Sequence, residues 1–238
     1  MVNTNLLISD AEKLGLSIEN DKIKQFEKLA ELLVEQNKTM NLTAITDPDG
    51  IAVKHFADSI SVLNAAKFDE KARVLDVGTG AGFPGIPLLI MRPDLDLTML
   101  DSTAKKLKYV ANTVEELGLT ANVLHTRAEE AGQSKEYRET FDIVCSRAVA
   151  ALNVLCEYCL PFVKVGGVFV AMKAAKAREE IEGAKAAIKL LGGQIVDEKS
   201  FTLSDGGERN LIIIKKISHV PPKYPRVSAQ IAKKPLKF

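Results

Sequence analysis

The chain has 238 residues, 46% of them hydrophobic, which suits one globular domain with an appendage; its net charge of +1 by itself predicts no partner. It has no apolar run long enough to span a membrane and no leader pattern at its start, so we expect no membrane segment and a cytoplasmic location. Its three cysteines argue against a disulfide framework, and Cys156-x-x-Cys159 has no second pair or nearby histidine, so we predict core cysteines and no metal site.

The first 68 residues predict a small helical cap. Residues 4–16 indicate a short helix, Asp21–Asn37 an amphipathic one, and Ile51–Ala66 a third, which follows a polar loop and the turn signal Asp47–Gly50. One face of the third helix carries, at positions i, i+3 and i+4, the polar residues His55, Asp58 and Ser59. These side chains could contact the substrate or fix the cap onto the cofactor site.

From Arg73 onward, apolar strands alternate with helices. The strands expected to be parallel are Arg73–Val77, Asp96–Leu100, Asn122–His125, Phe141–Ser146 and Val168–Met172. The helices expected beside them are Gly85–Met91, Ser102–Leu117, Leu152–Val163 and Arg178–Leu191. A short polar turn joins Ile195–Phe201 to Asn210–Lys215, so these two strands should form an antiparallel hairpin. Residues 69–217 therefore predict an α/β, Rossmann-like sheet of seven strands, the class I methyltransferase architecture, followed by a tail over 218–238.

The predicted domain is organised around the glycine loop Gly78-Thr79-Gly80-Ala81-Gly82. Glycines let a ligand approach the main chain, and free amides at the start of the next helix should point at that ligand. A dinucleotide fingerprint (Gly80, Gly82, Gly85) overlaps here with D-x-G-x-G-x-G, the S-adenosylmethionine pattern, which begins at Asp76. A carboxylate there suits the cationic end of S-adenosylmethionine and repels a pyrophosphate, so this cofactor is favoured over NAD.

Other candidates follow from strand polarity, because ligands of open parallel sheets lie at the carboxyl ends of the strands. Asp101, just after the second strand, can accept hydrogen bonds from both ribose hydroxyls of a nucleoside. The remaining candidates at these ends are Gly78–Phe83, Arg127–Glu129 and Ser146–Ala148.

The charge after Glu208 is all positive, with eight lysines and arginines and no acid. A basic end of this kind indicates an edge that faces phosphates, although a solvated tail would have the same composition.

Several stretches together match one family: NKTMNLTAI (37–45), KHFADS (54–59), LDVGTGAGFPGIPL (75–88), RAEE (127–130), SRAVA (146–150), KYPR (223–226) and KKPL (233–236). Over nearly its whole length the chain resembles the RsmG (GidB) family of bacterial rRNA guanine-N7 methyltransferases. The resemblance implies S-adenosylmethionine as cofactor and one guanosine of 16S rRNA, near the decoding centre of the 30S subunit, as substrate. It also implies cofactor contacts at Gly78, Phe83, Ala128, Glu129 and Arg147. At Met172-Lys173-Ala174 the chain departs from the glycine that many relatives carry.

The residues missing after the fourth strand bear on the chemistry. There is no Asn/Asp-Pro-Pro-Tyr for an exocyclic amine and no Pro-Cys for covalent cytosine chemistry, and Cys145 lies inside the strand. Guanine N7 has an unprotonated in-plane lone pair, so in-line attack on the methyl group needs no general base and can depend on orientation and desolvation.

The candidate residues fall into three sets. The catalytic set is Arg147, His55, Asp58 and Ser59, with Arg147 expected to pair with the cofactor carboxylate, guanine or a phosphate. The cofactor set is Asp76, Gly78, Gly80, Gly82, Phe83, Asp101, Ala128, Glu129 and Arg147. The rRNA set is Asn41, Lys173, Arg209, Tyr224 and Arg226, with Tyr224 stacking on a base.

We expect a monomer acting on 16S rRNA. Two other hypotheses stay open: a methyltransferase for a small molecule or a protein, and an assembly factor that senses S-adenosylmethionine without catalysis.

Overall fold

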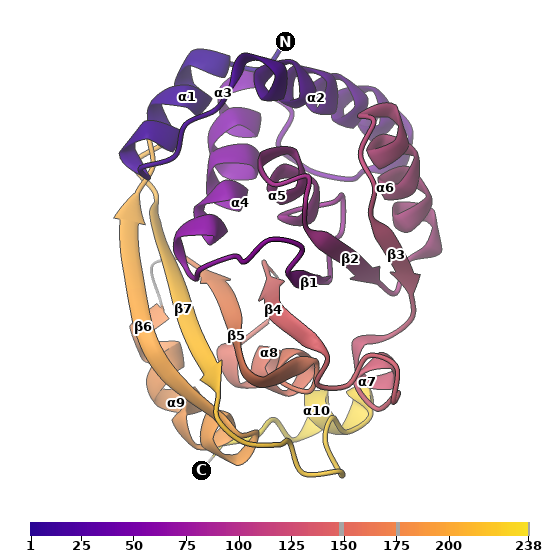
Figure 1. Ribbon diagram of the computed structural model, residues 1–238, viewed down its shortest axis with the longest axis vertical. Coiled ribbons are helices and arrows are strands. Elements are labelled where there is room, and N and C mark those ends of the chain that lie inside the picture. The colour runs from indigo at the N-terminus through magenta and orange to yellow at the C-terminus, as the bar shows by residue number, and fades with distance from the viewer. Residues whose placement is uncertain (148–149, 175–176, 238) are drawn as a thin grey trace.

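A seven-stranded sheet forms the centre of the computed structural model, which describes residues 1–147, 150–174 and 177–237 (Figure 1). The strand order is β3-β2-β1-β4-β5-β7-β6. The strands are β1 (Arg73–Val77), β2 (Asp96–Asp101), β3 (Asn122–His125), β4 (Phe141–Ser146), β5 (Val163–Lys173), β6 (Gly193–Thr202) and β7 (Glu208–Lys216). The first five are parallel, and β7 pairs antiparallel with both β5 and β6. The predicted α/β class, parallel core and terminal hairpin are therefore confirmed.

The pleat of the strands sends alternate side chains into two cores. Val74 of β1 belongs to the core shared with the N-terminal helices, while its neighbour Leu75 belongs to the core on the opposite face. Figure 1 shows the N-terminal helices and α5 (Gly85–Met91) on one side of the strands, and α8 (Leu152–Cys159) and α9 (Ala177–Leu190) on the other. The other helices of the domain are α6 (Ala104–Glu116), α7 (Ala128–Ala131) and α10 (Ser228–Lys233).

The strand β5 begins earlier than the sequence predicts. Gly166 and Gly167 were expected to form a loop before the strand, but they lie inside it. A Cβ on Gly167 would come within 2.6 Å of the Asp142 carbonyl oxygen, so the glycine permits a close approach of β4 and β5. The β4–β5 pairing has an irregularity at the same place, between Phe141 and Ile143.

The N-terminal cap consists of α1 (Thr4–Lys13), α2 (Asn20–Met40) and a helical run of four segments. The run comprises α3 (Pro48–Gly50), the π-helical η1 (Ile51–Ala57), α4 (Asp58–Ile60) and the 3₁₀ segment η2 (Ser61–Asn64). The cap shares one hydrophobic core with the sheet, and Phe26 of α2 packs on Phe56 of η1 at a ring separation of 5.0 Å. The wide turns of η1 shape the stretch that carries His55.

The C-terminal segment is packed onto the domain. Arg138 donates to the carbonyl oxygens of Val220 (2.9 Å) and Tyr224 (2.7 Å). Arg226 forms a bidentate ion pair with the fully buried carboxylate of Glu157, with Nε 2.7 Å from Oε1 and Nη2 2.6 Å from Oε2. Tyr224 is itself buried. The predicted basic tail over 218–238 is packed on the domain as far as Leu236, and we call this segment the strap.

This packing corrects two of the expected rRNA contacts. The Tyr224 ring lies in the core beside α8, where it cannot stack on a base, and the Arg226 guanidinium is committed to Glu157.

Among the described helices, none combines the length and apolar character needed to cross a bilayer.

We predict that replacing Arg226 destabilises the fold. Arg226→Ala leaves the buried Glu157 carboxylate without its cation, which lowers the free energy of unfolding by about 3 kcal/mol. Lys223→Ala is the matched control, because that ammonium only lies over the Tyr224 ring, 5.3 Å from its centre. Urea unfolding of both variants measures the difference, and equal stabilities would contradict the role assigned to the ion pair.

Candidate active site

The glycine loop is fastened to the end of β2 through its amides. The amides of Gly78 and Thr79 donate to the Leu100 carbonyl at 2.9 and 3.0 Å, and the Gly80 amide donates to Asp101 Oδ2 at 3.0 Å. Gly78 and Gly80 have φ angles of 76° and 59°, in the region that favours glycine. The loop therefore keeps an irregular path with its amide donors turned toward the protein.

The start of α5 differs from the prediction of free amides facing a ligand. Gly85 donates to Asp76 Oδ2 at 2.9 Å, and Ile86 donates to the Gly82 carbonyl at 2.8 Å. Gly82 is needed for packing, because a Cβ there would meet the Ile86 side chain at 2.3 Å. Carbonyl oxygens and bare Cα atoms are what this loop can offer to a ligand.

Asp76 supports the loop from beneath. Its side chain is fully buried, and burial raises its pKa from 3.8 to about 6. The nearby Thr79 hydroxyl and the Gly85 amide oppose this rise, although Asp76 Oδ1 and Thr79 Oγ1 have no partner in hydrogen-bond geometry. Asp76 Oδ2 thus holds the first turn of α5, and a contact of this carboxyl group with a cofactor ammonium stays a prediction.

A cavity of about 220 Å³ lies over the carboxyl ends of β1, β2 and β4; we call it the cofactor cavity. Four predicted residues line it: Gly78, Asp101, Ala128 and Glu129. Asp101 is fixed from both sides, because its Oδ1 accepts from the Thr103 amide at 2.8 Å. Arg127 and Ser146, also proposed from the sequence, line it as well, whereas sequence reasoning missed other lining residues, including Ser102, Leu155 and Tyr158. The last two come from α8, and no motif places that helix beside the loop.

The donors and acceptors of the cofactor cavity suit S-adenosylmethionine. Its ammonium and ribose hydroxyls are donors, and the cavity presents the carboxylates of Asp101 and Glu129 beside a loop whose Gly78, Thr79 and Gly80 amides are engaged. A pyrophosphate would need free amides and would meet those two acids. A Cβ at Gly78 would meet nothing within 4 Å, so the glycine leaves open space at the cavity wall.

Arg147, just after β4, joins this loop to the cap. Its Nη1 donates to the Lys54 carbonyl at 2.9 Å and lies 3.3 Å from Asp58 Oδ2. Its guanidinium also lies over the Phe83 ring, 5.1 Å from the centre. Ala148, which the sequence also proposed at this end of β4, lies outside the described residues.

His55 is the neutral partner of Arg147. Its ring stacks on Phe83 at 4.6 Å and an interplanar angle of 7°. Burial, followed by the charge of Arg147, lowers its pKa from 6.5 to about 3. A neutral His55 ring accepts at Nδ1 from Arg147 (3.3 Å) only in the tautomer that carries its proton on Nε2. In this tautomer Nε2 donates to Thr43 Oγ1 (2.9 Å).

The polar loop after α2 positions His55, which sequence reasoning missed. Asn37 holds Thr43 through two hydrogen bonds of 2.9 Å, to its amide and its carbonyl, and Thr43 holds His55. Asn41 takes the left-handed conformation that ends α2, with a φ of 49°. The signal was present in NKTMNLTAI, where the spacing of Asn37 and Thr43 allows this contact.

Two members of the predicted catalytic set fix the cap. Ser59 is fully buried and donates to the His55 carbonyl at 2.5 Å, so it cannot contact a substrate. Asp58 lies between two arginines, with Oδ2 facing Arg147 and Oδ1 3.2 Å from Arg209 Nε. Burial nevertheless raises the Asp58 pKa above its usual value, against the pull of both arginines.

A second cavity of about 300 Å³ opens beyond Arg147; we call it the acceptor cavity. The residues that line it include Asp58, Arg147, Met172, Lys173, Glu180 and Arg209. The proposed rRNA contacts Lys173 and Arg209 are both engaged here. Lys173 pairs with Glu180 at 2.8 Å, and Arg209 pairs with Asp205 at 2.9 Å as well as with Asp58.

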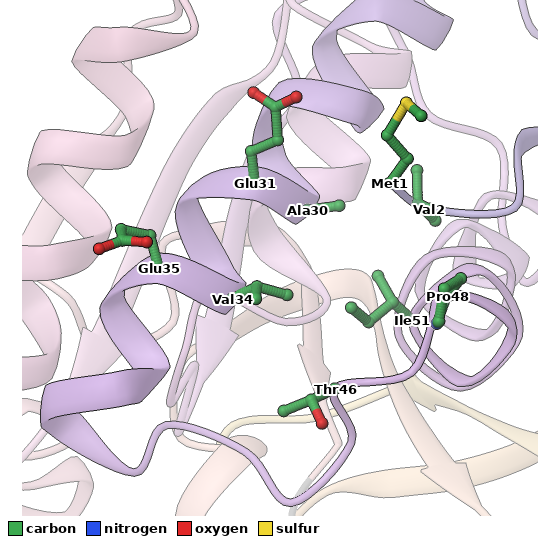
Figure 2. Close-up of a pocket in the computed structure, with 9 residues that line it drawn as sticks. All are labelled: Met1, Val2, Ala30, Glu31, Val34, Glu35, Thr46, Pro48 and Ile51. Carbon is green, nitrogen blue, oxygen red and sulfur yellow. The ribbon is translucent and has the colours of Figure 1, made fainter.

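A separate pocket lies away from the glycine loop. The pocket in Figure 2 lies in the cap between α2, the first residues and the start of η1, and none of the residues drawn there belongs to the glycine loop. No cluster of three potential metal ligands occurs in the described part of the chain, and Cys145, Cys156 and Cys159 are free and buried.

Comparison with known proteins gives the family. Residues 22–212 match the family described as GidB, rRNA small subunit methyltransferase G. The chain belongs to this family. Ribosomal RNA small subunit methyltransferase G of Alkaliphilus metalliredigens is 44% identical over all of both chains. That of Acetivibrio thermocellus is 47% identical over 97% of this chain and 96% of its own length. The predicted family and methyltransferase class are confirmed.

Solved structures with low sequence identity share the fold of this rRNA small subunit methyltransferase G family member. TrmN from Thermus thermophilus superposes with a TM-score of 0.53 at 16% identity, covering 67% of this chain and 48% of TrmN. The cyclase SpnF superposes with a TM-score of 0.54 at 17% identity, covering 68% of this chain and 82% of SpnF.

We predict that Gly78→Ala weakens cofactor binding in this family member. The methyl group would enter the cofactor cavity, so affinity for S-adenosylmethionine in calorimetry falls by at least about tenfold. Gly118→Ala is the matched control, because Gly118 also has a positive φ (68°) and open space around its Cβ, but it ends α6 away from the cavity. Both variants lose about 1 kcal/mol of stability. Equal cofactor affinities would refute the placement of Gly78.

We predict that Asp76 makes stability fall as pH rises. The folded-state pKa of about 6 exceeds 3.8, so the folded protein holds this proton more tightly than the unfolded chain. The resulting stabilisation is complete below the unfolded pKa and is lost as pH rises through the folded one. Asp76→Asn removes the titration, so the wild-type-minus-variant free energy of unfolding should drop by about 2 kcal/mol between about pH 4 and about pH 7. Urea unfolding over this range checks the slope, and a flat difference would contradict it.

Proposed function

We propose that this chain transfers a methyl group from S-adenosylmethionine to N7 of a guanosine in 16S rRNA, near the decoding centre of the 30S subunit. The observation that carries the proposal is a pair of cavities bordered by consecutive residues at the end of β4, in a member of a small-subunit rRNA methyltransferase family. Ser146 and Ala150 border the cofactor cavity, and Arg147 borders the acceptor cavity. A donor and an acceptor bound in the two can therefore meet at the end of β4.

The side chains around Arg147 support a reaction without a general base. Both ring nitrogens of His55 are engaged, and its pKa of about 3 makes it a weak base. Both carboxylate oxygens of Asp58 face arginines. Burial raises the pKa of Cys145 far above the range in which a thiolate nucleophile forms. A ring nitrogen with an available lone pair, such as guanine N7, is the acceptor that needs none of these groups.

The protein's contribution is then orientation and exclusion of water. Asp101 and Glu129 bind the donor groups of the nucleoside, and the glycine loop supports the methionine end. S-adenosylmethionine supplies the electrophilic methyl. Arg147 fixes the wall between the two cavities, so that the attacking nitrogen meets the methyl group in line and out of bulk water. The expected monomeric state and cytoplasmic location remain predictions.

The test is transfer of a labelled methyl group. We expect S-adenosylmethionine with a tritiated methyl to label 16S rRNA in 30S subunits that lack the modification, with the label at N7 of one guanosine after nuclease digestion. Arg147→Ala should reduce the rate by at least about a hundredfold, because it releases the loop from the cap. Label on a protein or small molecule but not on rRNA would support the alternative methyltransferases, and cofactor binding without transfer would support a sensing role.

The pH dependence of the same assay tests the chemistry. With no titrating base, the single-turnover rate should change by less than about twofold between about pH 6 and about pH 9. A profile that rises with an apparent pKa near 7 would contradict base-free transfer to N7.

A further inference from the structure

Two carboxylates line the acceptor cavity, and within the described part of the chain one of them, Glu180, has donors on a single oxygen. Asp58 and Glu180 both line it, facing the cations Arg147, Lys173 and Arg209. Each oxygen of Asp58 has its own arginine. Glu180 differs, because a single oxygen, Oε2, receives both Lys173 Nζ and the Leu152 amide, at 2.8 and 2.7 Å.

The other oxygen of Glu180 is therefore available to a ligand. Oε1 takes no donor from the described part of the chain, and 29% of the Glu180 side chain is exposed, against 13% for Asp58. Oε2 is meanwhile held from two elements, the first turn of α8 and the end of β5. This anchoring fixes the direction of the carboxylate, so that it presents a pre-oriented acceptor at the cavity wall.

A fixed carboxylate distinguishes guanine from adenine. Guanine carries two donors side by side, N1–H and the N2 amine, and a carboxylate can accept from both. Adenine has a lone pair at N1, which would face the negative charge. Recognition at this edge also leaves N7, on the opposite side of the purine, free of protein donors and able to attack the methyl group.

We propose that Glu180 is the residue that selects guanine, by accepting hydrogen bonds from the N1–H and N2 amine of the target base. Lys173 and the Leu152 amide are its positioning partners. This inference rests on the proposed function, since it names the recognition element for the same acceptor. The cavity volume of about 300 Å³ lies at the lower end of the range for small-ligand pockets, which suits a single flipped-out base.

The experiment compares unmodified 16S rRNA carrying guanosine or inosine at the methylated position. Inosine keeps N1–H, O6 and N7 but lacks the N2 amine. For the wild-type protein, loss of one hydrogen bond to a charged group should lower kcat/KM for inosine roughly 10- to 100-fold. In Glu180→Gln the side chain has one acceptor oxygen, which remains bonded to the Leu152 amide and Lys173. The amide NH₂ group then faces the base. The guanosine-to-inosine ratio should therefore fall to about one.

Controls separate recognition from structure. Glu179→Gln, at the exposed position next to Glu180 in α9, should keep the wild-type ratio. Glu180→Asp retains a carboxylate and should keep a ratio between those of wild type and Glu180→Gln. Calorimetric affinity for S-adenosylmethionine should be unchanged in all three.

The outcomes discriminate between the two proposals. If wild type methylates guanosine but Glu180→Gln keeps the wild-type ratio, or loses both substrates equally, Glu180 has only a structural role and this inference fails alone. If wild type transfers no methyl group to rRNA guanosine, the proposed function fails and this inference with it.

Discussion

The contacts of one guanidinium, that of Arg147, hold the active site together. It bonds the Lys54 carbonyl and Asp58 in the cap, contacts the ring of His55, and covers Phe83 of the glycine loop. A planar guanidinium with several fixed N–H donors can contact all of these partners at once, which a lysine ammonium on a flexible stem cannot. The cap also shares its core with the sheet, and Arg147 itself lines the acceptor cavity.

Burial sets the protonation states on which this joint depends. His55 must be neutral to accept from Arg147, and the same desolvation that lowers its pKa raises those of Asp58 and Asp76. A protonated imidazole beside Arg147 would place two cations in contact. The site therefore depends on excluding water as much as on its hydrogen bonds, and the same dryness favours attack on a sulfonium methyl by a neutral nitrogen.

The sequence specified the sheet more completely than the site. Arg73–Val77 was predicted to the residue, because an apolar run that stops at a glycine has one interpretation. The direction of the Asp76 side chain could also have been predicted. Asp76 lies two residues after Val74, so the pleat of the strand puts both side chains on the face that α5 covers. The packing of the strap could not be predicted from the sequence. Charge counting finds Arg226 basic, but only the fold brings it to Glu157, 69 residues earlier, and buries that carboxylate.

The direction of the amides in the glycine loop explains why one architecture serves two kinds of cofactor. A loop that leaves its amides free at a helix start binds phosphate, as the dinucleotide fold does. Here Asp76 takes the first amide of α5, and Asp101 and the Leu100 carbonyl take three more. With these four donors occupied, the start of α5 and most of the loop lack the free amides that a phosphate would bind.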